Sequence, residues 1–197
     1  PSIRGSLAGS GLQLQSALTG MTVNGMAAQG SFAGSRLVLS SLSGQTAGGG
    51  SVSGSGSFDF SGLGTKGPAI DLRIAARGAR ILARDDMAAN VTGPILVRSD
   101  GNGGTIAGRL GIDRGSWQLG RAAAAAELPA IATREVNRPL DRAAPRAAAT
   151  PWRFLIDAKA PARVDVRGMG IESEWSADIR LRGTSAAPAI EGRADLV

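Results

Sequence analysis

Apolar and polar residues alternate along most of the chain, and a period of two is typical of β-strands with one buried face. The alternation is sharp over residues 70–74 and longest over residues 171–182, where charged side chains occupy the opposite face. Gly, Asn, Asp and Pro interrupt it, and residues 100–104 have the composition of a tight hairpin turn. The sequence therefore predicts about ten to twelve strands and no long amphipathic helix to cover them.

Two strand-rich segments, residues 1–120 and 152–197, flank an Ala/Arg/Pro-rich insertion at residues 121–151. Within the insertion, residues 122–126 permit a short helix and residues 131–136 permit one more strand. Residues 138–151 have no periodicity, so we expect a disordered loop there. The chain begins without Met and stops just after a strand-like run, so we expect a fragment of a longer protein.

The fold class is all-β, and the sheet has to cover its own apolar face. It can close as a barrel, stack as a sandwich, coil as a solenoid, or bend lengthwise into a trough. The long strand at residues 171–182 and the 29 glycines, which let a sheet bend sharply, favour a trough or a solenoid. We expect an elongated, mostly antiparallel sheet bent into a U-shaped groove with an apolar interior.

Composition argues against an enzyme. The chain has no Cys, His or Tyr, which removes His-based triads, thiol nucleophiles and the usual zinc ligands. Residues 62–67 match the spacing of a dinucleotide loop, but Pro68 and a strand follow where a helix is required. The close carboxylate pairs, Asp85 with Asp86 and Glu172 with Glu174, suit a turn and cross-strand ion pairs. We expect no catalytic residues, no metal site and no cofactor.

Charge changes this picture little. The 22 cations are 20 Arg and 2 Lys and exceed the acids by 6, but they are scattered, and aromatic residues are 4% of the chain. Nucleic-acid binding needs clustered cations and aromatic rings for stacking, so we expect no nucleic-acid partner. No run of 18 apolar residues is present that would span a bilayer as a helix.

The apolar face is the feature that points to function. Gly, Ser and Ala recur on it, so it offers aliphatic surface without the bulk to fill a sheet-on-sheet core. An elongated groove of this kind suits acyl chains, whose burial is favourable by about 0.8 kcal/mol per CH₂. The alternation assigns to the groove lining Val52, Phe58, Phe60, Ile70, Leu72, Ile74, Val91, Ile95, Val97, Ile106, Leu110, Ile112, Trp152, Phe154, Ile156, Val164, Val166, Ile171, Trp175, Ile179 and Leu181.

A series of short motifs gives the chain a family likeness. In order, these are GGSVSG at residues 49–54 with FDF at 58–60, IDRG at 112–115 with WQLG at 117–120, LP at 128–129 with REVNRP at 134–139, GMGIESEW at 168–175, LRGT at 181–184 and PAIEG at 188–192. With these motifs the chain resembles the C-terminal region of the TamB family, in its alphaproteobacterial form.

This resemblance implies a long U-shaped trough with an apolar lumen. It also implies a periplasmic location, an inner-membrane anchor outside this fragment, and an outer-membrane barrel partner of the TamA type. The implied function is to shield phospholipid acyl chains during transport between the two membranes and to support outer-membrane protein assembly. Nascent outer-membrane proteins are further implied partners, and the resemblance brings no catalytic residues.

Two other architectures remain as alternatives. A structural β-solenoid of an adhesin or autotransporter passenger shares the Gly/Ser richness and the absence of Cys, but a solenoid has a repeat of about 20–30 residues, and none is visible. An outer-membrane barrel requires aromatic girdles, and Tyr is absent.

Overall fold

The computed structural model describes residues 4–17, 19–120 and 150–197, and the expectations for residues 121–149 lie outside this part. The described chain is all-β and contains no helix, and no segment of it is a helix able to cross a membrane. The strands are β1 (Arg4–Gln15), β2 (Thr22–Ala33), β3 (Arg36–Thr46), β4 (Ser51–Asp59), β5 (Ala69–Ala83), β6 (Met87–Ser99), β7 (Gly104–Gln118), β8 (Arg153–Gly168), β9 (Ile171–Gly183) and β10 (Pro188–Leu196).

All ten strands form a single open sheet in sequence order, from β1 at one end to β10 at the other. Each neighbouring pair is antiparallel except β7 and β8, which are parallel. A parallel pair requires the connecting chain to return to the opposite end of the strands. The all-β, mostly antiparallel sheet predicted from the alternation is therefore confirmed, and the sheet does not close into a barrel.

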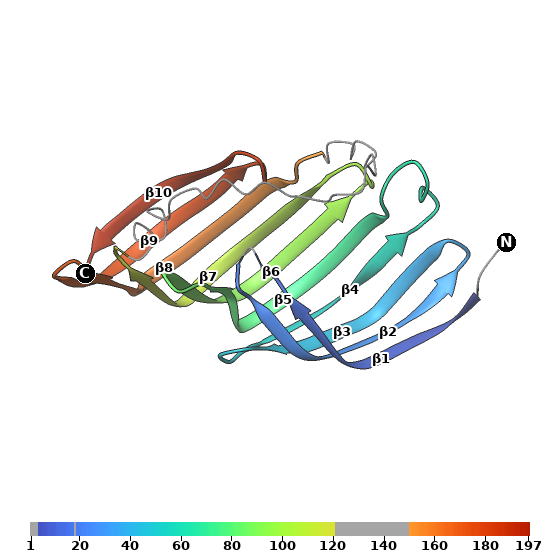
Figure 1. Ribbon diagram of the computed structural model, residues 1–197, viewed down its shortest axis with the longest axis horizontal. Coiled ribbons are helices and arrows are strands. Elements are labelled where there is room, and N and C mark those ends of the chain that lie inside the picture. Colours follow the sequence, from blue (N-terminus) through green and yellow to red (C-terminus); the bar gives the residue numbers. More distant parts are fainter. Residues whose placement is uncertain (1–3, 18, 121–149) are drawn as a thin grey trace, which may run out of the picture.

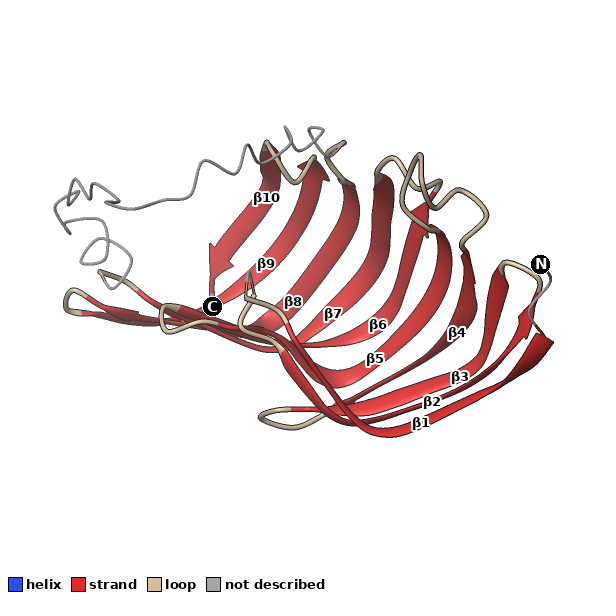
Figure 2. Ribbon diagram, turned by 45° about the vertical axis from the view of Figure 1, so that its right-hand side comes forward, coloured by secondary structure: helices blue, strands red, loops and turns tan. Residues whose placement is uncertain are grey.

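The sheet bends partway along its strands, so that one face becomes concave (Figures 1 and 2). We call the concave side the groove face and the convex side the outer face. The upper lip carries residues 60–68, 100–103, 150–152 and 184–187, and the lower lip carries residues 84–86, 119–120 and 168–170. Seven of the nine strand pairs have a register shift within the strands, β4–β5 and β9–β10 being the exceptions. Such shifts bend strands locally, and we call their line across the sheet the crease.

Glycine permits the crease in β5. Gly78 lies in the shift between Ala76 and Ala79 and has a φ of 57°. A left-handed backbone costs a side-chain-bearing residue roughly 1–2 kcal/mol, so glycine is the residue that fits inside a strand at this point. Gly25 in β2 (φ 58°) lies in an equivalent shift between Asn24 and Ala27.

The buried core is small and sits inside the bend. Ala76, Ala79, Val91 and Leu110 form its buried cluster, with exposed fractions of 0–6%. Partly buried side chains surround the cluster, and they are Val52, Ile81, Ile95, Ile112, Ile156 and Ala158. At the lower end of the sheet the turn between β1 and β2 reaches β5, where the Ala83 N–H donates to the Thr19 carbonyl oxygen at 2.8 Å. On the upper arm no second layer of described structure covers the groove face (Figure 2). The core therefore holds the bend, while the upper arm stays open.

Candidate functional site

The strand register aligns the apolar residues into rows that cross the sheet. Leu72 in β5 lies opposite Val97 in β6, and Val97 lies opposite Ile106 in β7. Because directly opposed residues share a face, each row is a continuous apolar band. The two longest bands are Leu39, Gly56, Leu72, Val97, Ile106, Phe154 and, beside it, Gly54, Ile74, Ile95, Gly108, Ile156, Leu181, Ile190.

From β5 to β8, burial on the groove face decreases from the crease toward the upper lip. Leu110 is 6% exposed and Val91 is 2% exposed, as expected for a packed core. Val97 and Ile106, which lie farther up the arm, are only partly buried. Over β5–β8 the upper arm therefore presents aliphatic side chains that are partly exposed, whereas Leu37 and Leu39 of β3 are buried.

Glycines set into the bands keep the arm shallow. Gly56 lies between Leu39 and Leu72, and a Cβ built on it would lie 2.8 Å from the Leu72 Cα and 2.1 Å from the Asp71 carbonyl oxygen. Gly54 is similar, since its Cβ would lie 2.6 Å from the Arg73 carbonyl oxygen. Backbone and side-chain atoms of β5 thus occupy the space where a side chain would stand on either glycine, so no side chain projects from these two positions.

The two lips differ in chemistry. At the upper lip, Trp152 packs over Gly104, whose Cβ would lie 2.5 Å from the indole ring, and the Phe58 and Phe60 rings stack with centroids 6.3 Å apart. Polar loops surround these rings. The lower lip instead exposes large apolar side chains, which are Met87 (38%), Trp117 (45%), Met169 (81%) and Ile171 (50%).

The outer face is polar and is held by ion pairs. Lys159 Nζ lies 3.2 Å from Asp178 Oδ2, and Arg167 and Glu172 are also 3.2 Å apart. Arg182 donates a hydrogen bond to Asp157, and this contact lowers the pKa of the Asp157 carboxyl below its usual value. These pairs are exposed, so each stabilises the sheet little by itself. Their effect is to keep the convex side in water and the apolar side in the groove.

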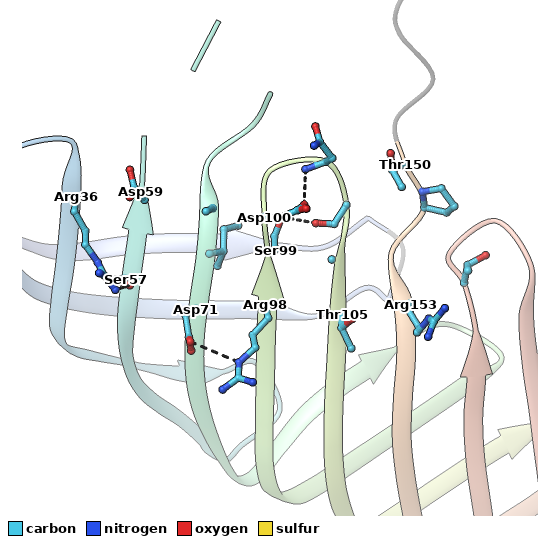
Figure 3. A pocket seen from close by; sticks show the side chains of 17 residues that line it. Arg36, Ser57, Asp59, Asp71, Arg98, Ser99, Asp100, Thr105, Thr150 and Arg153 are labelled. Carbon is cyan, nitrogen blue, oxygen red and sulfur yellow. Dashed lines mark hydrogen bonds and ion pairs between the residues drawn. The ribbon is translucent and has the colours of Figure 1, made fainter. Parts of the chain in front are cut away.

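A cavity of about 830 Å³ is also on the polar side, near the upper lip (Figure 3). Ser57, Asp71, Arg98, Thr105 and Arg153 form one outer-face row along its wall. Arg98 pairs with Asp71 at 3.5 Å. The cavity is wide and shallow, with cations and acids intermixed, and it brings together no nucleophile with a base.

Two further acids of this cavity act as turn caps. Asp59 accepts hydrogen bonds from the Ser61 backbone N–H at 2.9 Å and from the Ser35 hydroxyl at 3.1 Å. The Ser61 contacts are the main reason why the pKa of Asp59 is lowered. Asp100 accepts from the Asn102 N–H at 2.9 Å. In the described part of the chain, no group of three or more acids is placed to hold a metal ion.

The structure brings the predicted lining residues onto one face. Phe60 and Trp152 lie just outside β4 and β8, and the others lie within β4–β9 on the groove face. Ile171 lies at the lower lip and is half exposed, whereas Val91 and Leu110 belong to the buried cluster. Contact of these residues with lipid stays a prediction.

Sequence reasoning missed several residues of the groove face. Leu37 and Leu39 in β3 are each 8% exposed. Their spacing of two residues in the sequence was enough to place both on the groove face. Trp117 was missed for another reason. The register passes from Val91 opposite Ile112 to Asn90 opposite Arg114, so Asp113 is an extra residue that changes the phase of β7. Only a phase change at this point places Trp117 on the groove face.

Comparison with protein families gives one match. The TamB C-terminal domain matches residues 40–197, which is most of the chain and extends from β3 to the end of β10. The alphaproteobacterial form is not addressed by this match and stays an expectation. No curated protein and no solved structure matches the chain.

Proposed function

The chain belongs to the TamB family, a transport and assembly component of the translocation and assembly module in the bacterial envelope, and we propose that its groove shields phospholipid acyl chains as they pass between the two membranes. In this proposal the chain works in the periplasm, is anchored in the inner membrane by a segment outside this sequence, and is not an enzyme. Its outer-membrane partner is a barrel of the TamA type, and it also supports the assembly of nascent outer-membrane proteins.

One observation carries the proposal, namely the continuous apolar bands of the open upper arm. Leu72, Val97 and Ile106 lie in one band of the upper arm and are partly buried, with no described strand above them. An acyl chain laid along the groove would remove this surface from water, with a gain of about 0.8 kcal/mol for each CH₂ buried. The headgroup would remain at a lip, in contact with water.

The groove's polarity is consistent with a lipid whose two ends differ. Polar loops and the Trp152 indole lie at the upper lip, and an indole is suited to a boundary between apolar and wet surroundings. The β-solenoid alternative is not favoured, because a solenoid stacks short repeats into parallel coils, whereas this sheet is antiparallel in all pairs but one.

Native mass spectrometry of the chain, expressed in a bacterial periplasm and purified without detergent, tests the proposal. We expect copurified phospholipid. Phe154→Glu places a carboxylate in the upper arm and should remove the lipid, because an unpaired ion there disfavours an apolar chain. Leu155→Glu is the matched control, since Leu155 is the next residue, lies on the outer face and is 45% exposed. Equal lipid content in the two variants would contradict the groove as the binding site.

A further inference from the structure

The turn that joins β6 to β7 lies at the upper lip and carries two short polar side chains among glycines. It consists of Asp100, Gly101, Asn102 and Gly103, and Gly104 follows as the first residue of β7. Gly101 and Gly103 have φ angles of 98° and 142°, which glycine adopts readily because it has no Cβ. The backbone on both sides of Asn102 is therefore less restricted than that of an ordinary strand residue.

Side-chain hydrogen bonds hold most of this turn. Asp100 Oδ1 accepts from the Asn102 N–H at 2.9 Å. The Ser99 hydroxyl accepts from the Gly101 N–H at 3.0 Å and donates to the Gly103 carbonyl oxygen. Figure 3 labels Ser99 and Asp100 in this turn. The bonds engage the backbone N–H groups of Gly101 and Asn102 and the carbonyl of Gly103.

Two groups of the turn are left without a partner. Asn102 is exposed, and its side-chain amide makes no hydrogen bond with any residue that the structure describes. The Gly103 N–H likewise donates to no described residue. These two groups are neighbours along the chain, and an amide carbonyl next to a free backbone nitrogen can undergo ring closure. Asn is a chemically labile residue for this reason.

We propose that Asn102 is a site of spontaneous deamidation, at which the Gly103 backbone nitrogen attacks the Asn102 side-chain carbonyl carbon. A bond forms between this nitrogen and Cγ, the Cγ–Nδ2 bond breaks, and the proton lost by the nitrogen leaves with ammonia. Water then opens the resulting cyclic imide. Opening at Cγ gives aspartate, whereas opening at the main-chain carbonyl gives isoaspartate, in which the backbone runs through the former side chain. One water is consumed and one ammonia is released.

A second Asn-Gly pair provides a comparison within the same chain. Asn24 and Gly25 lie in β2, and both are exposed, as Asn102 is. Asn24 is nevertheless held at two points, because it pairs with Gln45 of β3 and its Oδ1 accepts from Gln13 Nε2 at 3.0 Å. Ring closure there requires the strand to open locally first. The same dipeptide should therefore react more slowly in β2 than in the turn.

Deamidation would change the charge of the upper lip. Asn102 borders the cavity of about 830 Å³, which Arg98 and Arg153 also line, and a second hollow of about 400 Å³ beside Lys66 and Trp152. The product adds a carboxylate near these cations and lowers the net charge of +6 by one. Isoaspartate also lengthens the backbone of the turn. The inference rests on the turn alone and does not depend on lipid binding in the groove.

Peptide mapping by mass spectrometry tests the proposal on the whole folded chain, incubated at mildly alkaline pH in water enriched in oxygen-18. Trypsin releases residues 99–109 and 5–36, and each peptide contains a single Asn. We expect the 99–109 peptide to convert with time into two isomeric products, aspartate and isoaspartate, each carrying oxygen from the labelled water. The 5–36 peptide should convert about tenfold more slowly or less, because its Asn reacts only when the strand opens.

Two controls separate the fold from the dipeptide. In guanidinium chloride both peptides should convert at similar rates, because the unfolded chain holds neither Asn. Asn102→Gln should abolish conversion of the 99–109 peptide, because the longer side chain does not close this ring, and circular dichroism checks that the variant folds. An unreactive Asn102, equal rates at Asn102 and Asn24 in the folded chain, or aspartate without isoaspartate overturns the proposal. A rate difference that persists in guanidinium chloride also overturns it, since the turn would then not be its cause.

Discussion

A carboxylate introduced at Leu110 and one introduced at Val97 should have very different effects on stability, although both residues lie on the groove face. Leu110 is 6% exposed, belongs to the buried cluster inside the bend and is flanked by β6 and β8. Val97 is half-buried on the upper arm, between Leu72 and Ile106. The comparison separates the closed part of the groove from the open part.

The magnitude at Leu110 follows from two terms. Leu110→Glu loses the transfer free energy of a buried leucine, about 1.5–3 kcal/mol. The carboxyl must then stay neutral, and protonating a group of pKa about 4.3 at pH 7 costs about 3.7 kcal/mol, at 1.36 kcal/mol per pH unit. Together these approach the total stability of a domain, which is about 5–15 kcal/mol.

At Val97 both terms are smaller. Val97→Glu loses most of the valine transfer term, or about 1–2 kcal/mol. The longer side chain can reach water from the open arm, so its charge adds little. We therefore expect Val97→Glu to fold with a loss of about 1–2 kcal/mol.

Urea unfolding followed by circular dichroism measures both values, with Leu110→Met and Leu96→Glu as controls. Leu96 precedes Val97 on the outer face and is 36% exposed. Burial raises the folded-state pKa of the carboxyl introduced at residue 110. Its penalty should therefore be full above that pKa and should disappear below the unfolded value of about 4.3. Equal losses at Leu110 and Val97 would show that the arm is a closed core and would refute the open groove.

Three further changes test the outer face, the bands and the lower lip. Arg182→Gln should raise the pKa of Asp157 toward its ordinary value, as followed by NMR titration. In the parent chain, the stability from this contact is present above the unfolded-state pKa of Asp157 and is lost as the pH falls through its lowered folded-state pKa. An unchanged Asp157 titration in the variant would contradict this assignment. Gly56→Val should lower the free energy of unfolding, measured with urea, by about 1–3 kcal/mol, because the new Cβ would meet backbone atoms. Gly5→Ala is the control and should leave the free energy of unfolding nearly unchanged, because the space around Gly5 is open. Met169→Asn should raise the melting temperature and add about 0.5–1 kcal/mol, because Met169 holds a φ of 54° that Asn tolerates better; a lower melting temperature would mean that the methionine side chain packs.

Which residues share a face of a strand could be predicted from sequence, because successive residues of a strand alternate between its two faces. The run from Ile171 to Leu181 keeps one phase throughout, and β9 pairs with β10 without any shift. This alternation is a property of a single strand, and burial of one face decides which set of residues points inward. The all-β class and the groove face therefore follow from the residues themselves.

The crease could not be predicted, because it depends on how neighbouring strands meet. Asp113 looks like one more polar residue in an alternating run, yet it is the extra residue that changes the phase of β7. Gly78 is one of 29 glycines, and nothing nearby distinguishes it from a turn glycine. The parallel pairing of β7 with β8 is also non-local, since it joins Thr105 to Arg153 across the intervening chain.

The crease also explains how so thin a core supports so long a sheet. Bending brings Ala79, Val91 and Leu110 together, so a few small and medium side chains can exclude water from the inside of the bend. The upper arm over β5–β8 contributes less to stability, because its aliphatic side chains remain partly exposed. A ligand that covers the arms binds only the folded chain and so stabilises it by mass action. In the proposed function, the open surface that weakens the empty sheet is thus the same surface that an apolar ligand would cover.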